Sequence, residues 1–305
     1  MSSPAPSELA AAAALLQSSP DYRVLTRLQY TDTFVTEHSG TIASAVVVDT
    51  ETTGTVHTAD QIIELGIVRF DYIVETGQIV RVSDVYSGLE DPGRPIPPQS
   101  TAIHGITDLM VAGQRLDEAR ILQILDGVTI VVAHNSGFDR PFLETRLPVF
   151  ASLRWGCTWA QIPWEAEGFS GSKLEYLCTT SGFFFDAHRS ETDCRALLEL
   201  IRRPLPRSGV IAFKHLLDTS AEPTLRLWAI RSPFETKDVL RERGWRWQGE
   251  RRCWYRTVSR SAAVEESEWL KAAVYGGKPA QIEVEVLDAK VLYSHRPGPT
   301  KTRVL

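Results

Sequence analysis

Five side chains that can bind a metal ion or move a proton occur in three short segments of this 305-residue sequence. Asp49 and Glu51 stand in V-V-D-T-E-T-T-G, Asp139 stands in H-N-S-G-F-D-R, and His188 and Asp193 stand in H-R-S-E-T-D. Carboxylate oxygens are the ligands that hard cations such as Mg²⁺ take, and histidine titrates near neutral pH. Together such groups can hold two metal ions and activate a water to hydrolyse a phosphodiester bond.

The first segment follows an apolar run, Ala45 to Val48, that predicts a buried strand. Residues two apart on a strand project to the same side, so Asp49 and Glu51 can converge on one point. Gly54 then breaks the strand. Taken alone, this pair is more typical of two solvated acids at a strand end than of a metal site, so the other segments decide the interpretation.

The second and third segments each place an aspartate at the start of a helix. The run 129–133 predicts another buried strand, and Asp139 falls in the first turn of the following helix, after Asn135 and Phe138. Asp193 precedes apolar residues at helical spacing, and His188 lies on the incoming loop, where it can take a proton from water. An aspartate at a helix start can also serve only the helix dipole. The ordered conjunction of all three segments favours a common site.

In order and spacing, these residues resemble the DEDDh (DnaQ-like) exonucleases, a family that includes polymerase proofreading subunits, ribonuclease T and oligoribonucleases. The matching residues, motif by motif, are Asp49 and Glu51, then Asn135, Phe138 and Asp139, then His188 and Asp193. Arg189 stands where the DEDDy branch has tyrosine, and Ser190 stands where many members have alanine. The resemblance covers about residues 44 to 203 and neither end of the chain.

The resemblance implies a two-metal 3′→5′ exonuclease that uses Mg²⁺ or Mn²⁺ and releases nucleoside 5′-monophosphates. It implies that Asp49, Glu51 and Asp193 hold the first metal, that Asp49 and Asp139 support the second, and that His188 is the general base. The residues it assigns to the terminal nucleotide are Thr52, Ile103, His104, Asn135 and Phe138. A structural role is an equal alternative for His104 and the expected one for His134.

The substrate class stays open at this point. DNA is the leading hypothesis, with a proofreading or repair role, and RNA ends or short oligoribonucleotides are the alternative, because no motif separates deoxyribose from ribose. A non-catalytic docking subunit with a nuclease-like fold is a third hypothesis, disfavoured because all five residues are present. The expected partners are the 3′ end of a nucleic acid and a polymerase or repair protein, although the C-terminal part favours a stand-alone enzyme.

Charge divides the chain into an acidic and a basic part. Residues 206–305 contain 18 Lys and Arg against 12 Asp and Glu, a charge of +6, and residues 1–205 carry −11. We therefore predict units with different roles. The predicted organisation is a helical extension (1–40), an exonuclease domain (41–205), a linker (206–224), a small basic α+β module (225–292) and a disordered tail (293–305).

The predicted fold is an α/β ribonuclease-H-like mixed sheet flanked by helices. Its expected strands are 44–50, 61–72, 79–89 and 129–134, with a hairpin turn at Thr76-Gly77. Before it, helices are expected at about Ser7 to Gln17 and Tyr22 to Leu28. After it, the module is expected to have strands at 225–230 and 282–286, helices at 233–243 (capped by Ser232) and 264–275, and a hairpin between the two helices.

That hairpin, W-R-W-Q-G-E-R-R-C-W-Y-R, alternates aromatic and basic residues. Aromatic rings that stack on bases beside guanidinium groups are typical of single-strand binding, so Arg246, Arg251, Arg252 and Arg256 are possible nucleic-acid contacts. The favoured interpretation of the tryptophans themselves is that they pack a small sheet against two helices.

The remaining features argue for a cytoplasmic protein with no membrane segment. No run approaches the 18 or so apolar residues of a membrane span. The Ala-rich stretch Leu9 to Leu16 follows Glu8 rather than basic residues, which predicts a helix rather than a signal peptide. The four cysteines have no paired spacing, so reduced, packed thiols are expected.

Overall fold

The computed structural model describes residues 6–305 and contains two compact units. The first unit is formed by Met1–Val128 and Ile162–Lys214, and the second by Thr129–Gln161 and His215–Leu305. The segment that carries Asp139 therefore groups with the C-terminal residues rather than with the strands between residues 42 and 89.

The first unit is built on three antiparallel strands, β2 (Ile42–Thr52), β3 (Ile62–Ile73) and β4 (Ile79–Leu89). Strand β3 is the most deeply buried of the three, and its buried residues include the charged Glu64 and Asp71 as well as its apolar residues. The turn between β3 and β4 requires a positive φ, which Gly77 supplies at 68°. The predicted strands and hairpin are confirmed.

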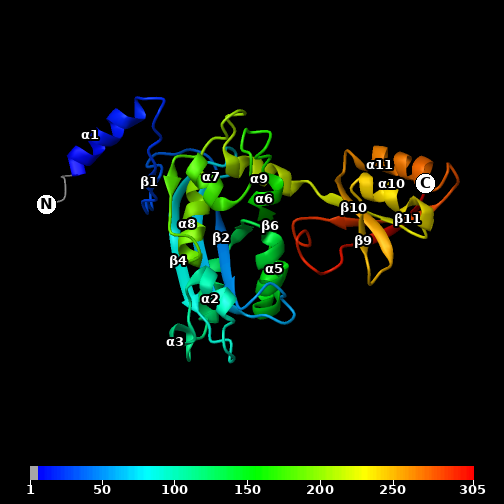
Figure 1. Cartoon of the computed structure of the whole chain (residues 1–305), viewed down its shortest axis with the longest axis horizontal. Coiled ribbons are helices and arrows are strands. Elements are labelled where there is room, and N and C mark those ends of the chain that lie inside the picture. Colours follow the sequence, from blue (N-terminus) through cyan, green and yellow to red (C-terminus); the bar gives the residue numbers. More distant parts are fainter. Residues whose placement is uncertain (1–5) are drawn as a thin grey trace. The chain divides into compact units, whose positions relative to one another are not determined.

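Five helices of the first unit follow the strands along the chain. They are α2 (Pro98–His104), α3 (Asp108–Val111), α4 (Glu118–Leu125), α7 (Leu174–Thr180) and α8 (Ser190–Ile201). Helix α8 is amphipathic and packs its apolar side on β2 and β3 (Figure 1).

The N-terminal residues confirm one predicted helix and correct another. Helix α1 (Pro6–Gln17) agrees with the prediction from Ser7 onward, and residues 1–5 lie outside the described part. The second expected helix, 22–28, is wrong. Residues Thr26–Arg27 form β1, which pairs in parallel with β7 (Phe183–Phe184), because the sheet supplies backbone partners that the local sequence does not reveal.

The second unit begins with β5 (Val128–Ala133), α5 (Ser136–Arg146), η1 (Pro148–Ser152), β6 (Trp155–Cys157) and α6 (Thr158–Gln161). Strands β5 and β6 are parallel. The larger sheet has the strand order β4-β3-β2-β5-β6 and combines this parallel pair with the antiparallel strands above. The predicted mixed α/β fold is confirmed.

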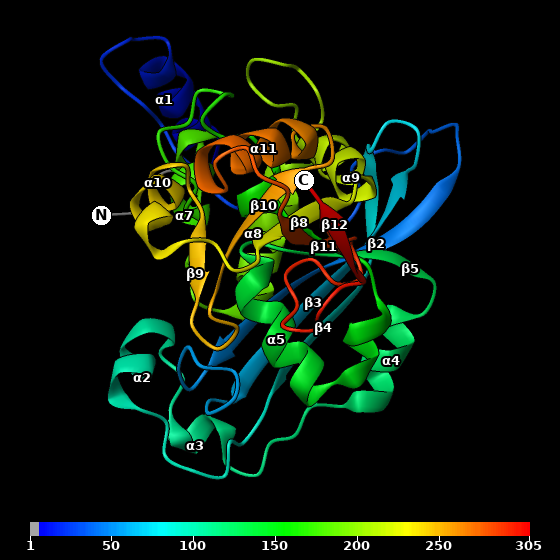
Figure 2. The ribbon, with the colours of Figure 1, turned by 90° about the vertical axis from the view of Figure 1, so that its right-hand side faces the viewer.

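The C-terminal module has its own five-stranded antiparallel sheet in the order β12-β11-β8-β10-β9. The strands are β8 (Thr224–Ala229), β9 (Arg246–Gln248), β10 (Cys253–Ser259), β11 (Gln281–Leu287) and β12 (Thr300–Val304). Figure 2 shows α10 (Lys237–Glu242) and α11 (Ala263–Trp269) over one face of this sheet. The short helix η2 (Phe234–Thr236) precedes α10, and the π-helix η3 (Leu270–Val274) continues α11.

Three expectations for this part of the chain are corrected. The predicted linker contains a helix, α9 (Ala212–Ala221), whose Phe213 is buried in edge-to-face contact with Phe70 and Tyr72. The predicted disordered tail contains β12, which is held by backbone pairing with β11. Ser232 does not cap the 233–243 helix, because η2 begins after Pro233 without a side-chain cap.

Two composition-based expectations can also be compared with the structure. All four cysteines are free and buried, which confirms the packed thiols. Along residues 6–305, none of the helices has the length and apolar character needed to span a bilayer.

Candidate active site

Asp49 and Glu51 lie on β2, where the strand pairs with β3. Their alternation with the buried Thr50 and Thr52 places both carboxylates on the same face, as predicted. In the antiparallel register Asp49 is opposite Gly66, and Glu51 is opposite Glu64. The two acids are partly buried, so their oxygens are held by the ladder rather than by mobile loops.

Asp193, in the first turn of α8, brings a third carboxylate to the same point. One ligand oxygen each from Asp49, Glu51 and Asp193 lies within 4.8 Å of the others. Three carboxylate oxygens at this spacing fit a hard divalent cation, which takes oxygen ligands and keeps several of its waters. The structure thus brings together the three acids that the sequence predicted for a first metal.

Gly66 allows α8 to approach β3 closely enough for this. A Cβ atom at position 66 would lie 2.5 Å from the carbonyl carbon of Ser190 and 2.6 Å from its oxygen. Only glycine leaves room for that backbone contact. Sequence reasoning missed Gly66, because a glycine inside a strand gives no sign of which backbone will pack on it.

Asp193 is in an environment that favours its neutral form in the absence of a cation. Burial raises its pKa from 3.8 to about 6, although the Arg189 backbone N–H donates to its Oδ2 at 3.0 Å and opposes the shift. A bound cation would reverse this preference, because it favours the ionised carboxylate. The raised pKa therefore fits a residue that binds metal.

His188 is held in an uncommon backbone conformation just before α8. Its φ is 68°, a left-handed value that costs a non-glycine residue energy unless the surroundings impose it. Its side chain is exposed, as a proton acceptor for water requires.

Arg189 and Glu64 supply the constraint on the His188 loop. The Arg189 side chain donates to both oxygens of Glu64, with an Nη2–Oε1 distance of 2.7 Å, and the Ser190 backbone N–H donates to Glu64 Oε2 at 3.0 Å. Glu64 is 1% exposed, and these bonds outweigh burial and raise the pKa of Arg189. Sequence reasoning missed Glu64, whose partners lie about 125 positions away.

The residues expected to contact the terminal nucleotide in the first unit differ in exposure. Ile103 is 61% exposed at the end of α2, whereas Thr52 is buried and donates to the Gly54 carbonyl at 2.6 Å. His104 is buried, and its Nδ1 accepts from the Ile106 N–H at 3.0 Å. Burial lowers the pKa of His104, outweighing the charge of Glu64, and its buried Nε2 has no hydrogen-bond partner within residues 6–305.

The second motif lies on α5 in the second unit. Asn135 adopts φ 75° at the turn from β5, a conformation that asparagine tolerates better than most residues. Phe138 packs on Phe142 with 5.2 Å between ring centroids, and Asp139 is 3% exposed. His134 Nδ1 lies 2.8 Å from Thr158 Oγ1, in keeping with a structural role. The metal role of Asp139 stays a prediction.

A network of buried charges anchors α5 to residues 289–296. Arg140 is fully buried, and its guanidinium donates to Glu144 Oε1 at 2.6 Å and to the backbone carbonyls of Ala289, Lys290 and Leu292. Glu144 also accepts from Ser294 at 2.6 Å and from Arg296 at 3.1 Å. Arg140 directly follows Asp139 in sequence, and the network around it was not predicted.

The arginines of the C-terminal hairpin fall into two groups. Arg256 binds Glu266 of α11 at 2.7 Å, and Arg251 pairs with Glu283 while its guanidinium lies 4.0 Å from the centre of the Trp228 ring. Arg246 and Arg252 are exposed. The tryptophans pack as expected in part, since Trp245 is buried beside Glu266, whereas Trp247 is 52% exposed.

Comparison with known proteins is decisive for the family. The profile of the RNase T family, described as exonuclease, matches residues 46–201, just over half of the chain. The chain belongs to this exonuclease family. The matched segment contains every residue of the predicted motifs, from Asp49 to Asp193.

Curated relatives of this exonuclease are similar over part of its length. The DNA polymerase III subunit epsilon of Treponema pallidum is 34% identical over 165 residues, which cover 50% of this chain and 72% of the relative. An epsilon-like protein of Rhodobacter capsulatus is 42% identical over 33% of the chain, and a PolC-type DNA polymerase III of Thermotoga petrophila is 38% identical over 37%. The chain spans only 14% and 8% of those two proteins.

Among solved structures, exonuclease X in complex with 5′ overhanging duplex DNA is 28% identical, with a TM-score of 0.40. The similarity covers 57% of this chain and 99% of that one. Escherichia coli exonuclease I in complex with a dA16 oligonucleotide is 14% identical with a TM-score of 0.46, over 60% of this chain and 48% of its own.

Proposed function

We propose that this protein is a metal-dependent 3′→5′ exonuclease that hydrolyses the terminal phosphodiester bond of DNA to release nucleoside 5′-monophosphates. The observation that carries the proposal is the convergence of Asp49, Glu51 and Asp193 within 4.8 Å beside the loop of His188. Membership of the exonuclease family supports the hydrolytic reaction.

The chain's own residues would divide the work as follows. Asp49, Glu51 and Asp193 would hold one divalent cation, Mg²⁺ or Mn²⁺, and the family motif assigns Asp49 and Asp139 to a second. Bound cations of this kind lower the pKa of water and stabilise charge on the leaving 3′ oxygen. His188, exposed and fixed by its left-handed backbone, would take the proton from the attacking water.

Other residues would bind and orient the 3′-terminal nucleotide. His104, whose pKa is lowered by burial, has its Nδ1 occupied by the Ile106 N–H, so Nε2 would carry the hydrogen, and this buried atom would have to become exposed to donate to the nucleotide. Ile103 would offer an exposed apolar surface to the base. Thr52, Asn135 and Phe138 are further contacts that the family resemblance assigns.

DNA is favoured over RNA by the names of the relatives. The Treponema pallidum protein, of which this chain covers 72%, is a DNA polymerase III subunit epsilon, which favours a role in proofreading or repair and a polymerase as partner. RNA ends are the alternative substrate, because no motif in the chain distinguishes deoxyribose from ribose, which depends on contacts with the 2′ position.

The test is a degradation assay on 5′-labelled single-stranded DNA, duplex DNA and RNA of one sequence. With Mg²⁺ we expect a ladder that shortens from the 3′ end and nucleoside 5′-monophosphates as the released product. Faster shortening of DNA than of RNA supports the substrate, and the reverse order assigns the enzyme to RNA.

Two variants make the assay specific to the site. Asp193→Asn should lower the rate at least about 100-fold, since metal-derived charge stabilisation contributes several kcal/mol. Asp218→Asn, which removes a carboxylate on α9 outside the cluster, is the matched control and should retain the wild-type rate. No metal-dependent shortening of any substrate, with Mn²⁺ also tried, would leave a docking subunit as the better account.

A further inference from the structure

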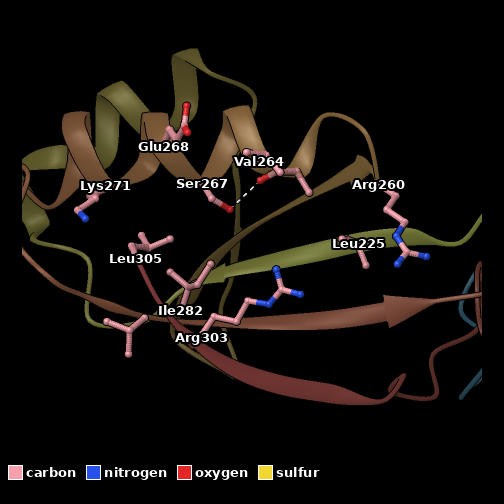
Figure 3. A pocket seen from close by; sticks show the side chains of 11 residues that line it. Leu225, Arg260, Val264, Ser267, Glu268, Lys271, Ile282, Arg303 and Leu305 are labelled. Carbon is pink, nitrogen blue, oxygen red and sulfur yellow. Dashed lines mark hydrogen bonds between the residues drawn. The ribbon is translucent and has the colours of Figure 1, made fainter.

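A cleft lies within the C-terminal module, between α11 and the strands β8, β11 and β12. Its volume is about 430 Å³, and Figure 3 shows the side chains that line it. The floor is aliphatic, formed by Leu225, Ile282 and Leu305. At its mouth Val264 and Val304 are 67% and 68% exposed, so apolar surface continues outward from the cleft.

Three cations surround this apolar floor, namely Arg260, Lys271 and Arg303. The described part of the chain gives none of the three an ion-pair partner, and Glu268 is the one acid in the lining. Other arginines of the module are paired internally, as Arg256 is with Glu266. The cleft therefore combines apolar contact area with an excess of positive charge available to a ligand.

The position of β12 adds backbone groups to the site. Among the strands of the described residues 6–305, β12 is at the end of its sheet and pairs with β11 alone, and all five of its residues are exposed. Arg303 pairs in register with Ile282, so it stands on the face of the sheet that carries the cleft. An extended peptide can pair with such an edge and place alternate side chains over that face.

We propose that this cleft is a docking site for an acidic peptide segment of a partner protein, with an apolar side chain seated on the aliphatic floor. Acidic residues of the segment pair with Arg260, Lys271 and Arg303. Nucleic acid fits less well, because the lining contains no aromatic ring on which a base can stack. The proposal goes beyond the proposed hydrolysis and does not depend on it.

The test uses the full chain and an array of heptapeptides of Asp and Glu that contain one or two Leu, Ile, Val or Phe residues. Matched arrays replace the acids by Lys or the apolar residues by Ser. We expect the protein to bind the acidic-apolar peptides and neither of the matched arrays, and we expect added salt to weaken this binding. Fluorescence anisotropy of the best-bound peptide then gives a Kd for each variant.

Charge reversal separates this cleft from the rest of the module. Lys271→Glu and Arg303→Glu should each weaken peptide binding at least about tenfold, because like charges would face each other. Arg246→Glu and Arg252→Glu, exposed on the hairpin, are the matched controls and should stay within about twofold of wild type.

The proposal is overturned if no acidic-apolar peptide binds, or if the control variants weaken binding as much as the cleft variants. It is also overturned if an oligo(dT) strand, added without metal, displaces the peptide from the wild-type protein and binds the Arg303→Glu variant more weakly than wild type. That last result would make the cleft a nucleic-acid site. Peptide binding is measured without turnover, so an inactive enzyme and an unoccupied docking site give separate results.

Discussion

Two largely buried carboxyl groups, Asp193 on α8 and Glu144 on α5, have pKa values shifted in opposite directions. Burial raises the pKa of Asp193 to about 6, because it outweighs the backbone hydrogen bonds from Arg189 and His188 and the charge of His188. Burial opposes ionisation of Glu144 too, but hydrogen bonds from Arg296, Ser294 and Arg140 outweigh it and lower the pKa.

The difference separates an acid whose charge the protein itself compensates from an acid that an external cation would stabilise. Glu144 is surrounded by donors within its own unit, so its negative charge is compensated in the folded protein. Asp193 instead converges with two further carboxylates, an arrangement that an external cation would stabilise. Burial alone does not separate the two roles, whereas the partners of each carboxylate do.

The largest expected effect comes from removing Arg140, which compensates the charge of Glu144. Arg140→Gln should lower the free energy of unfolding by about 3–5 kcal/mol, because Glu144 and three backbone carbonyls lose a buried charged donor. Urea denaturation at pH 7 measures the loss. Arg296→Gln is the matched control, with a loss of about 1 kcal/mol expected, since that side chain is 45% exposed. Equal losses in both variants would contradict a special role for Arg140.

Glu144→Gln tests the sign of the lowered pKa. A carboxyl group with a depressed folded pKa contributes stability above its ordinary value of 4.5 and loses it as pH falls through the folded pKa. The variant should therefore be less stable than wild type by about 2 kcal/mol at pH 7. The two proteins should approach each other in stability below pH 4, as measured by urea denaturation across that range. A difference that does not change with pH would show that the charge of Glu144 is not what matters.

Asp193→Asn should have the opposite effect on the metal-free protein. Stability linked to the raised pKa is present below pH 3.8 and lost as pH rises through about 6. As the pH is raised from 4 to 7.5, the free energy of unfolding of metal-free Asp193→Asn should therefore rise by about 1–3 kcal/mol relative to that of metal-free wild type. Adding Mg²⁺ should stabilise wild type more than the variant, which thermal unfolding at pH 7.5 measures. Destabilisation of the metal-free variant at pH 7.5 would show that the protein itself compensates the charge of Asp193, as it does for Glu144.

The smallest expected effect concerns the His188 loop, which directly precedes α8. Glu64→Gln removes the charge that holds Arg189 and the Ser190 N–H, so His188 should be less well placed. We expect kcat to fall about tenfold with KM little changed, because a small displacement of a general base costs a part of its contribution. Arg195→Gln, which breaks the ion pairs of Arg195 with Glu191 and Asp32, is the control and should leave kcat unchanged. A rise in KM alone would assign Glu64 to substrate binding.

The sequence predicts the elements whose signals are local. The apolar runs at β2, β3, β4 and β5 and the amphipathic pattern of α8 agree with the structure, and they place Asp49, Glu51 and Asp193 as expected. The remaining features depend on contacts between distant residues. Gly66 matters only where Ser190 packs on it, β1 exists only beside β7, and β12 is polar except for Val304 and is held by β11.

The bonds of Arg140 also have a consequence for the order in which the chain folds during synthesis. Its carbonyl partners follow it by 149 to 152 positions, so they leave the ribosome long after α5 does. At about 5–20 residues per second, that interval is about 7–30 seconds. Arg140 can therefore pair with Glu144 within its own helix from the start, but it completes its bonds to the backbone carbonyls only after residues 289–292 have been synthesised.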